Sequence, residues 1–285
     1  MSCYDLFMIL VTSLTQLLQN KHYLFSARAI LSMASLISAH GTNCRPASTS
    51  AHKTLQVGLT GSIGMGKSTC TKHFRSMGFQ VFDADAAVHE LYSVSGAAVD
   101  PIGKLFPDAI VDNAVFRPIL GKKVMEDSSV MTLLEAIVHP LVAKKRQEFF
   151  EAASSNGHFM VIYDIPLLLE NPMNQEVDYV IVATANARVQ RNRVLKRPGM
   201  TEEKFLSLLA KQMPDEEKRG LADFLIHTDY DSYAPGIAQA ANIVETIIAQ
   251  NPTLWSEWKS RGTKTKDFLT AGDAGSEILH FYTSP

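Results

Sequence analysis

The chain has 285 residues, a formal net charge of −2 at pH 7 and 46% hydrophobic residues, which suits a globular protein of one or two domains. Without a basic excess, nucleic acid is not expected as its partner. Its three scattered cysteines (Cys3, Cys44 and Cys70) form neither a disulfide framework nor a zinc-ligand pattern, so an intracellular compartment fits best.

The first 54 residues differ in character from the rest of the chain. They contain one acidic residue, Asp5, and are rich in Ser, Thr and Ala. Three interpretations stay open: an organelle transit peptide, a signal-like anchor built on the apolar residues 6–19, or a disordered extension with the true start at Met33. We expect a cytoplasmic protein, or a mitochondrial one if the segment is a transit peptide, without stable membrane insertion.

The stretch GSIGMGKST follows an apolar run (55–60) and opens a helical pattern that ends near Gly78. It fits G-x-x-x-x-G-K-[ST], in which glycines turn backbone N–H groups toward phosphate, the lysine reaches the β- and γ-phosphates, and the hydroxyl ligates Mg²⁺. The residues expected to bind ATP are Gly61, Ser62, Ile63, Gly64, Met65, Gly66, Lys67, Ser68 and Thr69.

Five apolar runs predict strands, and helical patterns separate them. The runs are 55–60, 79–85, 159–169, 177–184 and 222–228. This alternation predicts a parallel sheet covered on both faces, with ligands beyond the carboxyl ends of the strands. Two aspartates stand at such ends. Asp85 is either a catalytic carboxylate or a helix cap, and Asp164 is placed to hold Mg²⁺ directly or through water.

Two segments lie outside this alternation. Residues 86–158 form a long, mostly helical insertion with an apolar packing face from Val130 to Val138, which suggests a substrate-holding subdomain. Residues 186–219 are rich in Arg and Lys, as in a solvated helix face or a lid that closes over phosphates. From Asn251 the chain lacks sustained periodicity and is predicted to be a loose tail. Cys70 reads as a small buried residue.

Several ordered motifs between about residues 55 and 248 resemble the dephospho-CoA kinase family. They are FDADAAVHEL (82–91), HPLV (139–142), DIPLLLE (164–170), QRNRVLKR (190–197) and KQMPDEEKRGLADFLI (211–226). The resemblance implies a three-layer α/β P-loop NTPase fold with a five-stranded parallel sheet, a helical substrate-binding insertion and an arginine-rich lid. It implies ATP and dephospho-CoA as substrates, Mg²⁺ as cofactor, and phosphorylation of the ribose 3′-hydroxyl.

The resemblance also assigns residues to roles. It implies catalytic roles for Asp85, Lys67, Arg193 and Arg197, and metal binding by Ser68 and Asp164. It implies acceptor binding by Asp85, His89, Arg117, His139, Pro166, Leu167, Leu168 and Glu170. Three details can be tested against a structure. Gln190, Arg193 and Arg197 are expected on one helix face, His139 before Pro140 at a helix boundary, and Glu170 at the acceptor or in an exposed cap.

The chain departs from the family pattern after residue 226. The family carries an asparagine and then a glycine that help to hold adenine, where this chain has HTDY from His227 to Tyr230. The alternatives are another P-loop small-molecule or nucleoside monophosphate kinase, or a nucleotide-binding protein without catalysis. We expect a monomer or weak oligomer, divided into an extension (1–54), a kinase domain (55–250) and a tail (251–285).

Overall fold

The structure is a computed structural model that describes residues 53–170, 176–230 and 232–260. The predictions for residues 1–52 and for the tail beyond residue 260 fall outside these ranges. Among the described helices, none combines the length and apolar character that a membrane crossing requires.

The core is a five-stranded parallel sheet, as predicted. Its strands are β1 (Leu55–Thr60), β2 (Gln80–Asp83), β5 (Met160–Asp164), β6 (Tyr179–Thr184) and β7 (Phe224–His227), in the order β2-β5-β1-β6-β7. The apolar runs around β2 and β5 predicted strands that are too long at their carboxyl ends. The chain enters helix α4 after Asp83, and it turns after Asp164.

Helices cover both faces of the sheet. On one face, α3 (Lys67–Ser76) and α11 (Ala234–Gln250) pack their apolar sides against β1, β5 and β6, with Phe74 and Ile237 fully buried. On the other face, α7 (Ser129–Ser155) contributes Ala153 and Phe149 to a cluster around Tyr163 of β5. The three layers bring the carboxyl ends of the strands, and the loops after them, to one edge.

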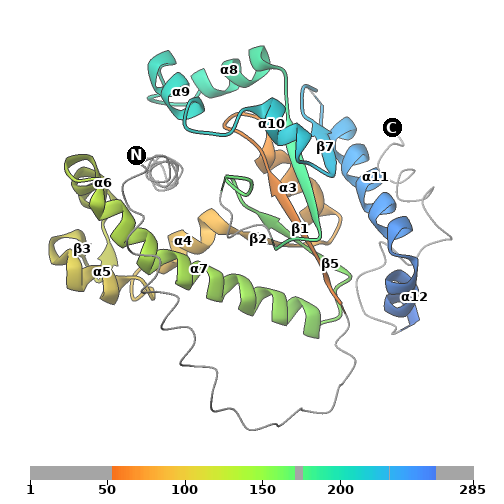
Figure 1. Cartoon of the computed structure of the whole chain (residues 1–285), viewed down its shortest axis with the longest axis horizontal. Helices are drawn as coiled ribbons and strands as arrows, with labels where there is room; N and C mark the ends of the chain where they lie inside the picture. The colour runs from red at the N-terminus through yellow and green to blue at the C-terminus, as the bar shows by residue number, and fades with distance from the viewer. Residues whose placement is uncertain (1–52, 171–175, 231, 261–285) are drawn as a thin grey trace, which may run out of the picture.

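The insertion is mostly helical, as expected, and Figure 1 shows it beside the sheet. Its elements are α4 (Ala84–Tyr92), α5 (Val99–Leu105), the 3-10 turn η1 (Pro107–Ala109), β3 (Ile110–Val111), β4 (Ala114–Val115), α6 (Arg117–Glu126) and α7. Val130, Leu134 and Val138 of α7 are buried in a second core, which confirms the predicted packing face. The β3–β4 hairpin was not predicted.

The prediction of a helix boundary at His139 is wrong. Helix α7 runs for 27 residues from Ser129 to Ser155, and Pro140 lies inside it. A proline usually interrupts a helix, but here the apolar face on both sides packs into two clusters, which hold the helix together across it.

The lid segment forms α8 (Ala187–Leu195), α9 (Glu202–Leu209) and α10 (Asp215–Gly220), and α8 and α9 lie above the sheet in Figure 1. Because α8 ends at Leu195, the exposed Arg197 lies in the bend after it. The expectation that Gln190, Arg193 and Arg197 share one helix face is therefore wrong for Arg197.

The prediction of a loose tail from Asn251 is also wrong over its first residues. Helix α12 (Pro252–Ser260) buries Trp258, whose indole N–H donates to the Gly157 carbonyl at 2.6 Å. Trp255 and Trp258 stack on each other and pack against Phe159. These two aromatic side chains, together with Leu254, anchor the helix on the core.

Candidate active site

The phosphate-binding loop connects β1 to α3, as predicted. Gly66 is the N-cap of α3 and has a positive φ of 86°. A Cβ atom there would lie 2.7 Å from Thr228 Oγ1, so the position excludes larger residues. Ser68 and Thr69, in the first turn of α3, are exposed. The free N–H groups and the dipole at this helix start favour an anion.

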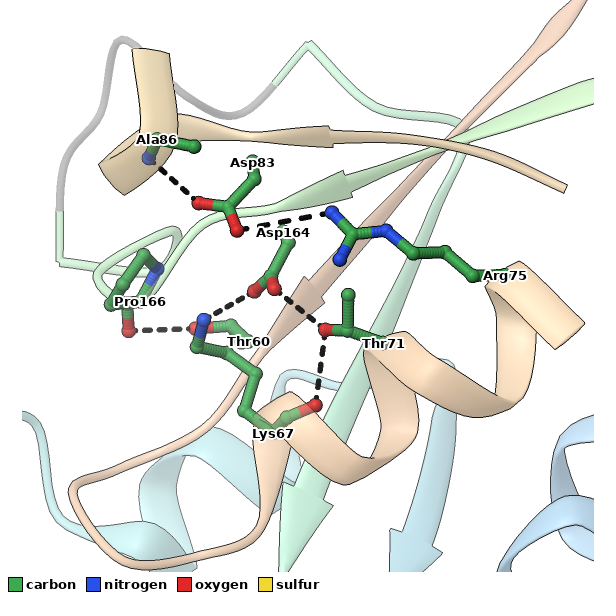
Figure 2. A network of polar contacts seen from close by, with 8 residues as sticks. All are labelled: Thr60, Lys67, Thr71, Arg75, Asp83, Ala86, Asp164 and Pro166. Atoms are coloured by element: carbon green, nitrogen blue, oxygen red, sulfur yellow. Dashed lines mark hydrogen bonds and ion pairs between the residues drawn. The ribbon is translucent and has the colours of Figure 1, made fainter. Parts of the chain in front are cut away.

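Lys67, Asp164 and Thr71 form a small polar network at the end of β5 (Figure 2). Lys67 Nζ donates to Asp164 Oδ1, and the Thr71 hydroxyl donates to Asp164 Oδ2 at 2.6 Å. The Asp164 side chain is buried, and its carboxylate is satisfied by these two partners. The sequence assigned no role to Thr71, although its spacing of four from Lys67 on one helix places both on the same face.

Two aspartates of the DAD motif take different positions. Asp83, rather than Asp85, is the N-cap of α4, and its Oδ1 accepts from Ala86 N–H at 2.9 Å (Figure 2). Asp85 lies in the first turn of α4, not at the end of the strand. The parallel register pairs Asp83 with Asp164, so the three carboxylates gather at one sheet edge.

The electrostatics of Asp85 are unusual for an aspartate. Burial raises the pKa of its carboxyl from 3.8 to about 6, and the negative charges of Asp83 and Asp164 act in the same direction. The positive charges of Lys67 and Arg117 oppose this rise. A carboxylate with a pKa near neutrality is suited to accept a proton during a reaction.

The insertion places Arg117 against two side chains of α4. Arg117, the first residue of α6, lies over the Tyr92 ring at 5.4 Å, and its Nη2 is 3.2 Å from His89 Nδ1. Arg117 also acts electrostatically on Asp85. His139, by contrast, is half-buried in α7, and desolvation lowers its pKa, so its ring is neutral near pH 7.

The segment after β5 is buried rather than open. Leu167 and Leu168 are each 1% exposed, and the Pro166 carbonyl accepts from the Thr60 hydroxyl at 2.9 Å (Figure 2). Glu170 is not an exposed cap. Its Oε1 pairs with the fully buried Lys218 Nζ at 2.7 Å and accepts from the Met213 backbone N–H.

One lid arginine, Arg193, contacts Thr228 in the HTDY stretch, where the sequence departs from the family pattern. Arg193 Nη1 donates to the Thr228 hydroxyl at 2.9 Å, and its second terminal nitrogen donates to the Thr228 carbonyl. The same hydroxyl donates to the Met65 carbonyl of the phosphate loop at 2.8 Å. Thr228 therefore joins the loop, the lid and the end of β7, a contact that no sequence pattern indicated.

The donor set at the loop is compatible with a hard cation. The exposed Ser68 hydroxyl and the Asp164 carboxylate supply oxygen atoms, the ligands that Mg²⁺ prefers. Across residues 53–170, 176–230 and 232–260, no cluster of three or more His, Cys, Asp or Glu side chains could hold a metal by itself. Cys70 is buried, and desolvation raises its pKa to about 12, so it is an inert thiol.

Comparisons with known proteins agree with this geometry. The family model described as dephospho-CoA kinase (CoaE) matches residues 55–233. The dephospho-CoA kinase of Mesorhizobium japonicum is 48% identical over 67% of this chain and 94% of its own length, and that of Ruegeria pomeroyi is 46% identical over 70% and 98%. The crystal structure of TT1252 from Thermus thermophilus, 30% identical, superimposes with a TM-score of 0.58 over 69% of this chain and 97% of its own.

Proposed function

The chain belongs to the dephospho-CoA kinase family, and we propose that it transfers the γ-phosphoryl group of ATP to the ribose 3′-hydroxyl of dephospho-CoA with the residues described above. The observation that carries the proposal is the meeting of Lys67, Asp164 and Asp85 beside the phosphate loop. A cation for phosphate, a carboxylate for metal and a carboxylate with a raised pKa are the parts that phosphoryl transfer requires.

The phosphate loop holds the ATP phosphates. In the proposed complex the backbone N–H groups of Gly64, Gly66, Lys67 and Ser68 face the anion, since those of Met65 and Thr69 donate to the Ser62 and Gly66 carbonyls. Lys67 exchanges Asp164 for oxygens of the β- and γ-phosphates. Arg193 and Arg197 approach from the lid, where their guanidinium groups spread positive charge over the transferring group. An arginine in this role contributes ~10³-fold or more in rate.

Ser68 and Asp164 are the residues that would hold Mg²⁺. When bound with ATP, the ion neutralises the developing charge on the β- and γ-phosphate oxygens. Release of Lys67 toward phosphate frees Asp164 Oδ1, while Thr71 keeps the carboxylate oriented through Oδ2.

Asp85 acts as the base for the acceptor. Its carboxylate takes the proton of the ribose 3′-hydroxyl as that oxygen bonds to the γ-phosphorus. The bond from the γ-phosphorus to the β–γ bridging oxygen breaks, and ADP leaves. With a pKa of about 6, the carboxylate is mostly ionised at pH 7 and close enough to neutrality to accept a proton.

Acceptor binding falls to two groups of residues. Arg117 presents positive charge toward Asp85, and His89 contacts its guanidinium, an arrangement that suits the phosphates of dephospho-CoA. The other expected acceptor-binding residues are buried or half-buried, so they support the wall of the acceptor site. They are Pro166, Leu167, Leu168, His139 and Glu170.

A coupled ADP-release assay with ATP and Mg²⁺ tests this function against its alternatives. The acceptors are dephospho-CoA, AMP, CMP, shikimate and water. We expect turnover with dephospho-CoA alone. Turnover with AMP, CMP or shikimate instead would assign another small-molecule kinase, and ADP release with water alone would indicate a nucleotide hydrolase.

A further inference from the structure

A single residue of the phosphate loop, Ile63, is held by two buried glutamines from the lid. Gln212 Oε1 accepts from the Ile63 N–H at 2.9 Å, and Gln190 Nε2 donates to the Ile63 carbonyl at 2.8 Å. The orientation of each amide is fixed by its partner, because a backbone N–H can only donate and a carbonyl can only accept.

Apolar contacts reinforce this junction. The Ile63 side chain is 1% exposed and clusters with Val194 of α8 and Phe205 of α9. The next residue, Gly64, lies so close to α8 that a Cβ atom would be 2.5 Å from Val194 Cγ2. The loop and the lid are therefore packed directly against each other at this point.

The two glutamines come from the two arms of the helical hairpin that α8 and α9 form in the lid. Gln190 lies within α8, three residues before Arg193, and Gln212 follows the end of α9. Gln212 thus binds the peptide unit before Ile63, and Gln190 binds the peptide unit after it. Ile63 lies just before the part of the loop that faces phosphate in the function proposed above.

We propose that Gln190 and Gln212 are positioning residues that hold the phosphate loop in its nucleotide-binding shape and set the arginine lid over it. Each acts through the Ile63 backbone, and fixing that backbone in advance removes an ordering step from ATP binding. The inference rests on the proposed function only in taking the ligand of the loop to be ATP.

The opposite polarity of the two hydrogen bonds gives a sharp test. Glutamate at position 212 keeps an acceptor for the Ile63 N–H, whereas glutamate at position 190 removes the donor and sets a carboxylate against the Ile63 carbonyl. Both glutamines also border a cavity of about 990 Å³. Methionine at either position removes the hydrogen bond at similar size.

We expect Gln190→Met, Gln190→Glu and Gln212→Met to raise the KM for ATP and the Kd for Mg·ADP about tenfold or more, from the loss of a buried hydrogen bond. The KM for dephospho-CoA should stay within about threefold. Gln212→Glu should recover most of the loss caused by Gln212→Met, while Gln190→Glu should be at least as damaging as Gln190→Met.

Thr54→Val is the matched control. It removes a partly buried hydrogen bond, to the His158 carbonyl at 2.9 Å, just before the amino end of β1 and away from the phosphate loop. It should lower the melting temperature without changing the KM for ATP. The proposal is overturned if folded Gln190→Met and Gln212→Met bind Mg·ADP as the wild type does, or if the two glutamate variants behave alike. If Gln190→Glu does not fold, the two methionine variants and Gln212→Glu decide the matter. Nucleotide binding is measured without an acceptor, so failure of the proposed kinase reaction would be seen separately, as absent turnover by the wild type.

Discussion

Replacing Asp85 with asparagine should make the protein more stable and far less active. In the folded protein the pKa of Asp85 rises from 3.8 to about 6, chiefly through burial. At about 1.4 kcal/mol per pH unit, keeping this carboxylate ionised destabilises the fold by about 3 kcal/mol at most. The asparagine side chain carries no charge to desolvate, so the variant escapes this penalty.

The sign of the pH dependence follows from the raised pKa. Well below pH 3.8 the carboxyl is protonated in both the folded and the unfolded chain, and the penalty is absent. As the pH rises from 4 to 6, the unfolded chain ionises first, and the wild type loses stability that Asp85→Asn keeps. The gain of the variant should therefore be small at pH 4 and grow to its full value above pH 6, where it corresponds to roughly 6–12 °C in melting temperature.

Thermal and urea unfolding of both proteins between pH 4 and pH 8 measure this difference, since other titrating groups contribute equally to both. Turnover of Asp85→Asn should fall by about 10²–10⁴-fold, as expected for loss of a general base. Wild-type kcat should decline about tenfold per pH unit below pH 6. The assignment would be refuted if the variant were less stable than the wild type at pH 8 or if its stability gain did not change with pH. Turnover at the wild-type rate would refute it as well.

Three further changes have distinct expected outcomes. Gly66→Ala combines a positive φ with a Cβ 2.7 Å from Thr228, so ATP binding should fall at least tenfold. Its control, Gly199→Ala, also has a positive φ but lies in open space, so it should cost about 1 kcal/mol of stability and leave the KM for ATP unchanged. Equal KM values for the two variants would contradict the steric argument. Lys218→Met leaves the buried Glu170 carboxylate without its ion-pair partner and should lower the free energy of unfolding by about 3–5 kcal/mol. A second change, Glu170→Met, should restore much of this loss. Additive losses in the double-mutant cycle would show that the pair is not coupled. Trp258→Ala should lower the free energy of unfolding by about 3–5 kcal/mol without changing either KM, and an unchanged unfolding midpoint would mean that α12 does not stabilise the domain.

Local patterns in the sequence were enough to predict the five strands of the main sheet, the phosphate loop and the helical insertion. Each of these elements has a short-range signal: an apolar run, a glycine–lysine motif or a helical period. The loop at Gly61 and the carboxylate at Asp164 could be placed because Gly61 directly follows one buried strand and Asp164 ends another. The prediction of Cys70 as a small buried residue is confirmed for the same reason, since it lies on the apolar face of α3.

What the sequence did not predict depends on contacts between distant residues. Pro140 is tolerated inside α7 because the helix packs on both sides of it, and α12 is held by Trp258 against a residue about 100 positions earlier. The order of the strands, which pairs Asp83 with Asp164, is likewise a long-range property. Thr228, in the HTDY stretch that departs from the family pattern, binds Met65 and Arg193, and only the folded chain reveals these contacts.

Identification of the product tests the central claim most directly. Purified protein is incubated with ATP, Mg²⁺ and dephospho-CoA, and the products are analysed by ³¹P NMR and mass spectrometry. The account predicts ADP and a dephospho-CoA that carries one new phosphate monoester on the ribose 3′-oxygen. ADP with free inorganic phosphate and unchanged dephospho-CoA, or a phosphate at another position, would contradict it.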